Sequence, residues 1–133
     1  MASGAPREVR VGVYENEPKI FMGANGQPSG ILGDLLVQVA EQERWTLVPV
    51  PCEWQACLDA LKDGKLDLMP DVAITEQRDT VFDFHKVPAL LSWSQIYKRS
   101  GIAINSALDL QGKRIAVLSG SVQQTYQIGR AHV

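Results

Sequence analysis

The sequence predicts an α/β fold with a mostly parallel sheet. Segments rich in β-branched residues alternate with segments whose apolar residues recur at helical spacing, and most connections between them are short. At 133 residues the chain has room for at most one ordinary domain. No internal repeat or low-complexity segment interrupts the alternation.

The composition is that of a folded globular protein. Hydrophobic residues make up 45% of the chain and charged residues 21%, with a formal net charge of −2. This balance argues against a basic nucleic-acid-binding surface and a polybasic membrane arm. No apolar run approaches the length of a membrane span, and no signal peptide opens the chain. We therefore expect no contact of this segment with nucleic acid or membrane.

The first half of the chain alternates strand and helix signals. Residues 9–14 predict a first strand, and a loop rich in Gly, Pro and Asn follows. A helix is expected next, with Ser29 as its N-cap. Residues 46–50 predict a second strand. The expected helix is identified by apolar residues at helical spacing: Ile31, Leu32, Leu35, Leu36, Val39 and Ala40.

A second helix is predicted over WQACLDALK, ending at Gly64. One face of this helix is apolar and consists of Trp54, Cys57, Leu58 and Leu61. Residues 66–71 predict a third short strand, and residues 81–84 a further extended piece.

The second half of the chain carries two more strand signals. Residues 90–97 are aromatic and β-prone, and residues 113–120 predict a strand that leads through a Gly/Ser turn into a helix start. Only seven residues follow Tyr126, and they hold no further strand. Because one strand and one short helix cannot bury an apolar face alone, we expect one nearly complete lobe followed by the start of a second.

The two cysteines, Cys52 and Cys57, lie five residues apart. No histidine or second cysteine pair completes a zinc pattern. A disulfide between them is geometrically possible only if the intervening chain is not fully helical. The sequence favours Cys57 as a core-facing helix residue and leaves the disulfide open.

Ordered motifs from Val9 to Tyr126 resemble the first half of the type II periplasmic solute-binding proteins, amino-acid-binding class (family 3). The matching motifs are VRVGVYENEPKIF, GQPSGILGDLL, WQACLDALKDGKLDLM, ITEQRDTVFDF and LDLQGKRIAVLSGS. Within the class, PDVAITEQR and FHKVPALLSWSQIY are most similar to the extracytoplasmic sensor domains of bacterial histidine kinases.

The resemblance implies a periplasmic binding protein-like II fold, in which two α/β lobes are joined by crossing strands and hold a ligand between them. On this pattern residues 8–97 form lobe 1 with its first crossing strand, and residues 98–127 form the hinge and the start of lobe 2. We interpret residues 1–7 as a non-native leader and residues 128–133 as a tail of the same kind.

The resemblance implies that Arg78 clamps a ligand carboxylate, since a planar guanidinium can donate two parallel hydrogen bonds. The alternative is a surface arginine paired with Glu76 or Asp79. Trp54 matches the position of a ligand-stacking ring, although core packing explains it equally well. Tyr14 and Phe21 fall in the ligand-facing region, where either could instead pack on its neighbours.

Asp71 and Ala73 depart from the family pattern, which favours a small residue and then a threonine. Asp71 could receive a ligand ammonium, but its preferred interpretation is a cap for the turn at residues 74–78. Ala73 lacks the hydroxyl that usually contacts the carboxylate. In lobe 2, the backbone N–H groups of Gly120 and Ser121 are expected to donate to the same carboxylate, as a helix N-terminus can.

No catalytic residue, metal site or cofactor is predicted. His85 and His132 have no partner at catalytic or metal-binding spacing, and no phosphate-binding glycine loop is present. The expected function is an extracytoplasmic sensor domain that closes on a small carboxylate-bearing solute. The alternatives are the receptor of an amino-acid transporter and, from another class, an enzyme on the same fold. We expect the segment to lie on the periplasmic side of an inner-membrane protein and to dimerise, through strand exchange if its second lobe is incomplete.

Overall fold

The structure is a computed structural model that describes residues 5–93 and 95–124. The chain divides into two compact units, unit 1 ending at His85 and unit 2 beginning at Lys86. The expected leader lies partly within the described residues, where β1 already begins at Arg7. The expected tail lies outside them.

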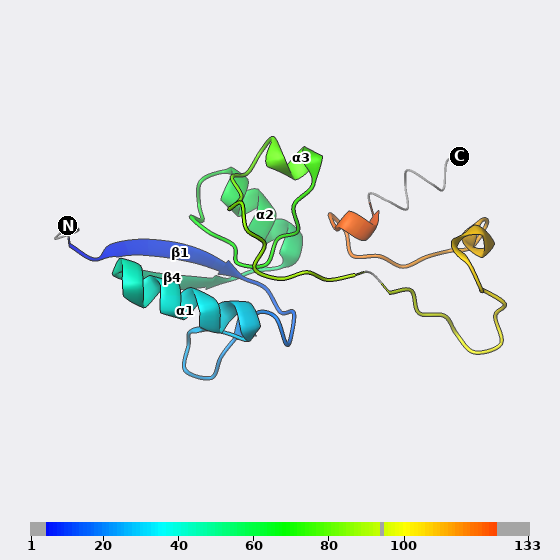
Figure 1. The fold of residues 1–133 in the computed structure, drawn as a ribbon, viewed down its shortest axis with the longest axis horizontal. Helices are drawn as coiled ribbons and strands as arrows, with labels where there is room; N and C mark the ends of the chain where they lie inside the picture. Colours follow the sequence, from blue (N-terminus) through cyan, green and yellow to red (C-terminus); the bar gives the residue numbers. More distant parts are fainter. Residues whose placement is uncertain (1–4, 94, 125–133) are drawn as a thin grey trace. The chain divides into compact units, whose positions relative to one another are not determined.

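Unit 1 is built around strand β1 (Arg7–Val13), which pairs in parallel with β4 (Trp45–Pro51) from Arg7↔Trp45 to Val13↔Pro51. Figure 1 shows the two strands side by side. On its other edge β1 forms a parallel bridge between Val11 and Leu68. The third strand expected at residues 66–71 is thus reduced to one bridge, and β1 is the central element of three.

Helix α1 (Ile31–Glu43) covers one face of this sheet. Side chains on a strand alternate between faces, so every second residue of β1 points toward α1. The core on this side consists of Val9, Val11, Val13, Ile20 and Leu36. A short antiparallel pair, β2 (Phe21–Met22) with β3 (Pro28–Ser29), leads into α1.

One detail of the predicted helix is wrong. The N-cap of α1 is Gly30 at φ 91°, a backbone conformation that suits glycine, and Ser29 instead donates from its hydroxyl to the Gln27 carbonyl. Ile31 and Leu35 are exposed, because the α1 face turned toward the sheet is the one that carries Leu32, Leu36 and Ala40.

Helix α2 (Trp54–Lys62) packs on the opposite face, against the residues of β1 that point away from α1. Gly12 makes this close approach possible, since a Cβ there would lie 2.6 Å from Leu66 Cδ1 and 3.4 Å from Cys57 Sγ. The predicted apolar face is confirmed for Trp54, Cys57 and Leu58, which are buried, while Leu61 is partly buried. The chain turns at Gly64, which has a positive φ of 76°.

Arg10 fastens the chain after α2 to β1. Its guanidinium donates to both carboxylate oxygens of Asp67 at 3.0 Å and to the Gly64 carbonyl at 2.9 Å, while its backbone N–H donates to Asp67 Oδ2. These hydrogen bonds lower the pKa of Asp67 to about 2 from an ordinary 3.8. The clamp sets the segment that carries Leu68 beside β1.

Helix α3 (Glu76–Asp79) is a single turn, and the extended piece expected at residues 81–84 does not form. The backbone N–H groups of Val81 and Phe82 donate to the Arg78 carbonyl, so the chain continues to turn after α3.

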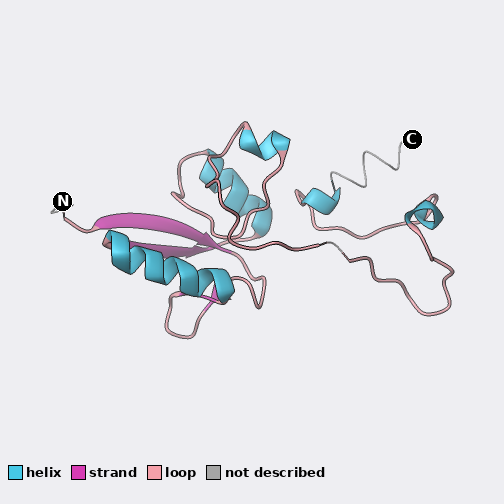
Figure 2. Cartoon of the chain, in the orientation of Figure 1, coloured by secondary structure: helices cyan, strands magenta, loops and turns pink. Residues whose placement is uncertain are grey.

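Unit 2 contains the short 3-10 helix η1 (Ala107–Leu110). A capping box holds its start, because Asp109 accepts from the backbone N–H of Ser106 and the Ser106 side chain accepts in return. Figure 2 shows that most of the described chain beyond α3 is loop.

The strands predicted at residues 90–97 and 113–120 are absent from the described part of unit 2. A strand needs a neighbour that completes its hydrogen-bond ladder, and these segments pair with none in the described residues. The predicted helix start is seen at residues 122–124, and the rest of the segment predicted to be helical lies outside the described residues.

The Arg10–Asp67 clamp predicts a pH-dependent stability. Asp67 has a lowered pKa in the folded protein, so its contribution is complete above about pH 4 and is lost as the pH falls toward 2. Asp67→Asn should therefore lower the midpoint of thermal unfolding at pH 7, and the gap from the parent protein should close near pH 2. Asp63→Asn, at an exposed position four residues earlier, is the matched control. A gap that is constant with pH would contradict the assignment.

Candidate ligand-binding site

The candidate site lies where the parallel elements of unit 1 end. β1 ends at Val13 and β4 at Pro51, and the bridge at Leu68 runs parallel to both. Their carboxyl ends therefore share one edge, and open α/β sheets bind ligands at this edge. The residues that follow these three elements include Tyr14, Trp54 and Asp71, all candidates for ligand contact from the sequence, each with a structural alternative.

Tyr14 and Asp71 are joined by a short hydrogen bond. The Tyr14 hydroxyl lies 2.7 Å from Asp71 Oδ2, and Asn16 Nδ2 donates to the same oxygen at 2.9 Å. Burial, and secondarily the bond to Asp71, raises the pKa of Tyr14 well above its ordinary 10. Tyr14 is therefore a neutral donor at physiological pH, and it holds the carboxylate in one orientation.

Trp54 is 8% exposed, so it belongs to the core, which was one of the two roles considered for it from the sequence. Its ring meets the Tyr14 ring edge to face, with centroids 4.8 Å apart, a geometry worth about 0.5–1.5 kcal/mol beyond area burial. Its indole Nε1 is buried and has no hydrogen-bond partner among the described residues. An unpaired buried donor is costly, and this one lies on the ring that lines the site.

Arg78 is held by α3 and by the same tryptophan. Its guanidinium carbon lies 5.3 Å from the Trp54 ring centroid, within cation–π range, and Nη1 donates to the Ala73 carbonyl at 2.9 Å. Burial lowers the pKa of Arg78, although an arginine stays charged at any physiological pH. Ala73 thus acts through its backbone in orienting Arg78.

Thr75 is the N-cap of α3, since its hydroxyl accepts from the Arg78 backbone N–H at 3.1 Å. The preferred interpretation of Asp71 as the cap of this turn is therefore wrong. The β-region backbone of Thr75 places its side chain directly over the turn, as a cap requires, and Asp71 binds Tyr14 and Asn16 instead.

The structure thus brings together Tyr14, Trp54, Asp71, Ala73 and Arg78 from five positions in the sequence. A fixed cation and an anion gather around one aromatic pair. Such a set can bind a small molecule that carries both a carboxylate and an ammonium.

Sequence analysis did not single out Asn16, although it lies between Tyr14 and Phe21 in the region expected to face the ligand. In the structure Asn16 closes a small turn with Ile20, whose backbone N–H donates to the Asn16 carbonyl while the Asn16 N–H donates to the Ile20 carbonyl. This turn directs the Asn16 amide toward Asp71.

Phe21 lies elsewhere in unit 1. It lines an open pocket of about 710 Å³ together with Glu17, Pro18, Ser29, Gly30, Ile31 and Asp34. None of the other residues expected to contact ligand lines this pocket. A role of Phe21 in ligand binding therefore stays a prediction.

Gly120 and Ser121 belong to unit 2, and their backbone donors make local bonds. The Gly120 N–H donates to the Gln124 side chain at 2.7 Å, and the Ser121 N–H to the Leu118 carbonyl. The buried Ser121 hydroxyl accepts from the Gln124 N–H, as in an N-cap. Carboxylate binding here would require Gln124 to release Gly120.

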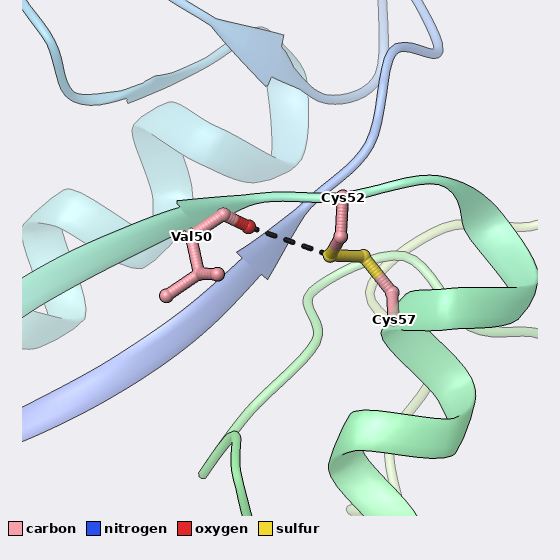
Figure 3. Close-up of a disulfide and its surroundings, with 3 residues drawn as sticks. All are labelled: Val50, Cys52 and Cys57. Atoms are coloured by element: carbon pink, nitrogen blue, oxygen red, sulfur yellow. Dashed lines mark hydrogen bonds between the residues drawn. A yellow bond between two sulfur atoms is a disulfide. The ribbon is translucent and has the colours of Figure 1, made fainter.

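The open question of the cysteines is answered by a disulfide between Cys52 and Cys57, with Cα atoms 5.5 Å apart (Figure 3). Cys52 precedes α2, so the chain between the two residues is not fully helical, and Cys57 is also buried in the core as expected. Cys52 Sγ lies 3.4 Å from the Val50 carbonyl oxygen; because a disulfide sulfur carries no proton, this is a sulfur–oxygen contact. Closing so short a loop stabilises the fold by about 2 kcal/mol in the chain-entropy model.

Within the described residues, no cluster of three His, Cys, Asp or Glu side chains is arranged to hold a metal ion. The same part of the chain has no helix with the length and apolar character needed to cross a bilayer.

Comparison with known proteins identifies the family. Residues 9–116 match the model of the bacterial extracellular solute-binding proteins, family 3. A probable histidine-binding protein of Campylobacter jejuni is 26% identical over 118 residues, which are 87% of this chain and 46% of that protein. The chain therefore spans about half the length of this relative.

Two solved structures are also similar. An ancestral arginine-binding protein bound to glutamine is 26% identical, with a TM-score of 0.72 over 97% of this chain and 58% of the other. A histidine kinase sensor domain with similarity to periplasmic binding proteins is 27% identical, with a TM-score of 0.50 over 56% of this chain and 33% of the other. The fold is thus periplasmic binding protein-like II, and the chain belongs to the family 3 bacterial extracellular solute-binding proteins.

Proposed function

We propose that unit 1 provides one wall of a binding site for an α-amino acid, with Arg78 receiving its carboxylate and Asp71 its ammonium. The observation that carries this proposal is the placement of both charged groups around the Tyr14–Trp54 ring pair at the carboxyl edge of the sheet. A zwitterion satisfies both charges, whereas a simple carboxylate leaves Asp71 without its counterion.

The charged groups are fixed before the ligand arrives, which favours affinity. Arg78 is held by Ala73 and Trp54, and Asp71 by Tyr14 and Asn16. Ligand binding then costs little side-chain entropy at these groups. The named ligands of the relatives, histidine and arginine or glutamine, support the amino-acid class.

The proposed role is that of an extracytoplasmic sensor domain. A ligand that touches both lobes favours the closed arrangement, because its affinity for that arrangement is higher. Closure would then pass through the membrane anchor of the complete protein to its output domain. The similarity to a histidine kinase sensor domain supports this role and a periplasmic location.

The second candidate role is a receptor that delivers an amino acid to a transporter, and the Campylobacter relative favours it. The two roles use the same site. What the gene encodes beyond Val133 distinguishes the two roles. A membrane-spanning segment followed by a kinase supports the sensor, and a stop codon after the second lobe supports the receptor. Dimerisation stays a prediction from the sequence for either role, as does the absence of enzymatic activity.

Arg78→Lys should weaken amino-acid binding about tenfold, and Arg78→Ala about tenfold to a hundredfold, because a charged hydrogen-bond pair is lost and lysine cannot replace a planar fork. Binding is measured by titrating the ¹⁵N-labelled chain with single amino acids and following backbone amide shifts, which detects weak complexes. Arg99→Ala, at an exposed arginine of unit 2, is the control. Equal amino-acid affinity of the Arg78→Ala and Arg99→Ala proteins would contradict carboxylate binding by Arg78. The absence of backbone amide shifts with every amino acid tested would contradict the ligand class.

Asp71→Asn should weaken binding of an amino acid but not of its des-amino analogue, because only the former has an ammonium.

The same variant should lower the pKa of Tyr14, because the hydrogen bond to Asp71 is lost. The pKa should still exceed the ordinary 10, because burial is the larger cause of its rise. Burial and the bond to Asp71 favour the neutral phenol, so the stability from Tyr14 is present below pH 10 and declines above it. Absorbance at 295 nm as a function of pH, with Tyr14→Phe subtracted, reports this titration.

Asp79→Asn, an exposed acid on α3, serves as the control for both measurements. Equal losses for the amino acid and its des-amino analogue would place the ammonium elsewhere.

A further inference from the structure

The disulfide encloses the central ring of the candidate site. Cys52 follows β4, Cys57 lies in the first turns of α2, and Trp54 lies between them as the first residue of the helix. The Cys52 backbone N–H donates to the Val13 carbonyl at 3.0 Å. One end of the bridge is therefore fastened to the end of β1, next to Tyr14.

The start of α2 lacks the usual side-chain restraint. Its N-cap, Glu53, makes no side-chain capping bond, and the helix has only nine residues, too few to be stable alone. The Trp54 indole N–H also makes no hydrogen bond within the described residues. Besides the packing of α2 on β1 and the contacts of the Trp54 ring, the covalent bridge restrains the first turn.

We propose that Cys52 and Cys57 are positioning residues for Trp54, and that reduction of their disulfide by a dithiol loosens Trp54 and weakens ligand binding. The second part of this inference rests on the proposed function. Trp54 contacts both Tyr14 and Arg78, so movement of its ring removes the support of the carboxylate-binding group as well as the aromatic wall.

The two sulfur atoms differ in access, which sets the course of reduction. Cys57 is fully buried, and Cys52 is partly exposed. A dithiol thiolate attacks Cys52 Sγ, the S–S bond breaks, and Cys57 Sγ leaves and takes up a proton. The second thiol of the reductant then displaces Cys52 Sγ, which is also protonated, so that two electrons pass to the protein and the dithiol becomes a cyclic disulfide.

The first test follows hydrogen exchange of the tryptophan indole N–H groups in the ¹⁵N-labelled chain, before and after reduction with dithiothreitol. A buried indole exchanges only when the structure opens locally. We expect the Trp54 indole, assigned with Trp54→Phe, to exchange at least tenfold faster after reduction. The Trp45 indole, from a partly buried ring of β4 that packs against the core on the α1 side, should change less than twofold. Equal acceleration of both would indicate general destabilisation and overturn the proposal, as would no change at Trp54.

The second test uses Cys52→Ser combined with Cys57→Ala, the alanine being chosen because position 57 is buried. This variant should show fast Trp54 exchange and be insensitive to dithiothreitol; parent-like protection would overturn the proposal. Amino-acid affinity should fall at least threefold on reduction of the parent chain and stay constant in the variant. If the oxidised parent chain binds no amino acid, the proposed function fails, while the exchange measurement still decides whether the disulfide positions Trp54.

Discussion

The central position of β1 is the constraint on which unit 1 depends. A strand with neighbours on both edges must have its backbone groups paired on both, and a strand covered on both faces must have side chains that suit both. β1 meets the first demand with β4 and the bridge to Leu68, and the second with valines toward α1 and Gly12 toward α2. Because all three elements run parallel, these demands also bring their ends, and the polar residues that follow them, to one edge of the sheet.

Polar groups at this edge are partly removed from water, and each needs compensation. The Tyr14–Asp71–Asn16 bonds compensate one carboxylate, and the Ala73 carbonyl with the Trp54 ring supports one guanidinium. The two groups are therefore held by different partners of the protein rather than relying on each other. A site built in this way keeps a cation and an anion oriented in the absence of ligand, which a direct pairing of the two side chains would prevent.

Much of unit 1 could be predicted from the sequence, because its signals are local. The alternation in β1 and the helical spacing in α1 and α2 are matched by the structure. Two of the errors in unit 1 concern choices between two adequate local solutions. Ser29 and Gly30 both suit a helix start, and Asp71 and Thr75 both suit a cap; the backbone conformation of each residue, which the sequence does not reveal, decides between them. Asn16 was missed because its contact with Asp71 spans 55 residues.

Unit 2 shows the limit of the same reasoning. Residues 90–97 and 113–120 are rich in residues that favour strands, yet the described residues there form none. Strand propensity measures how well a side chain suits a pleated, half-buried surface, and that surface exists only when a neighbouring strand is present. Helix α1 satisfies its own backbone hydrogen bonds, whereas a strand depends on residues far away in the sequence. The prediction was therefore reliable for α1, α2 and the β1–β4 pair. It failed where the described residues supply no ladder: residues 66–71 keep one bridge, and residues 81–84, 90–97 and 113–120 form no strand in the described part of the chain.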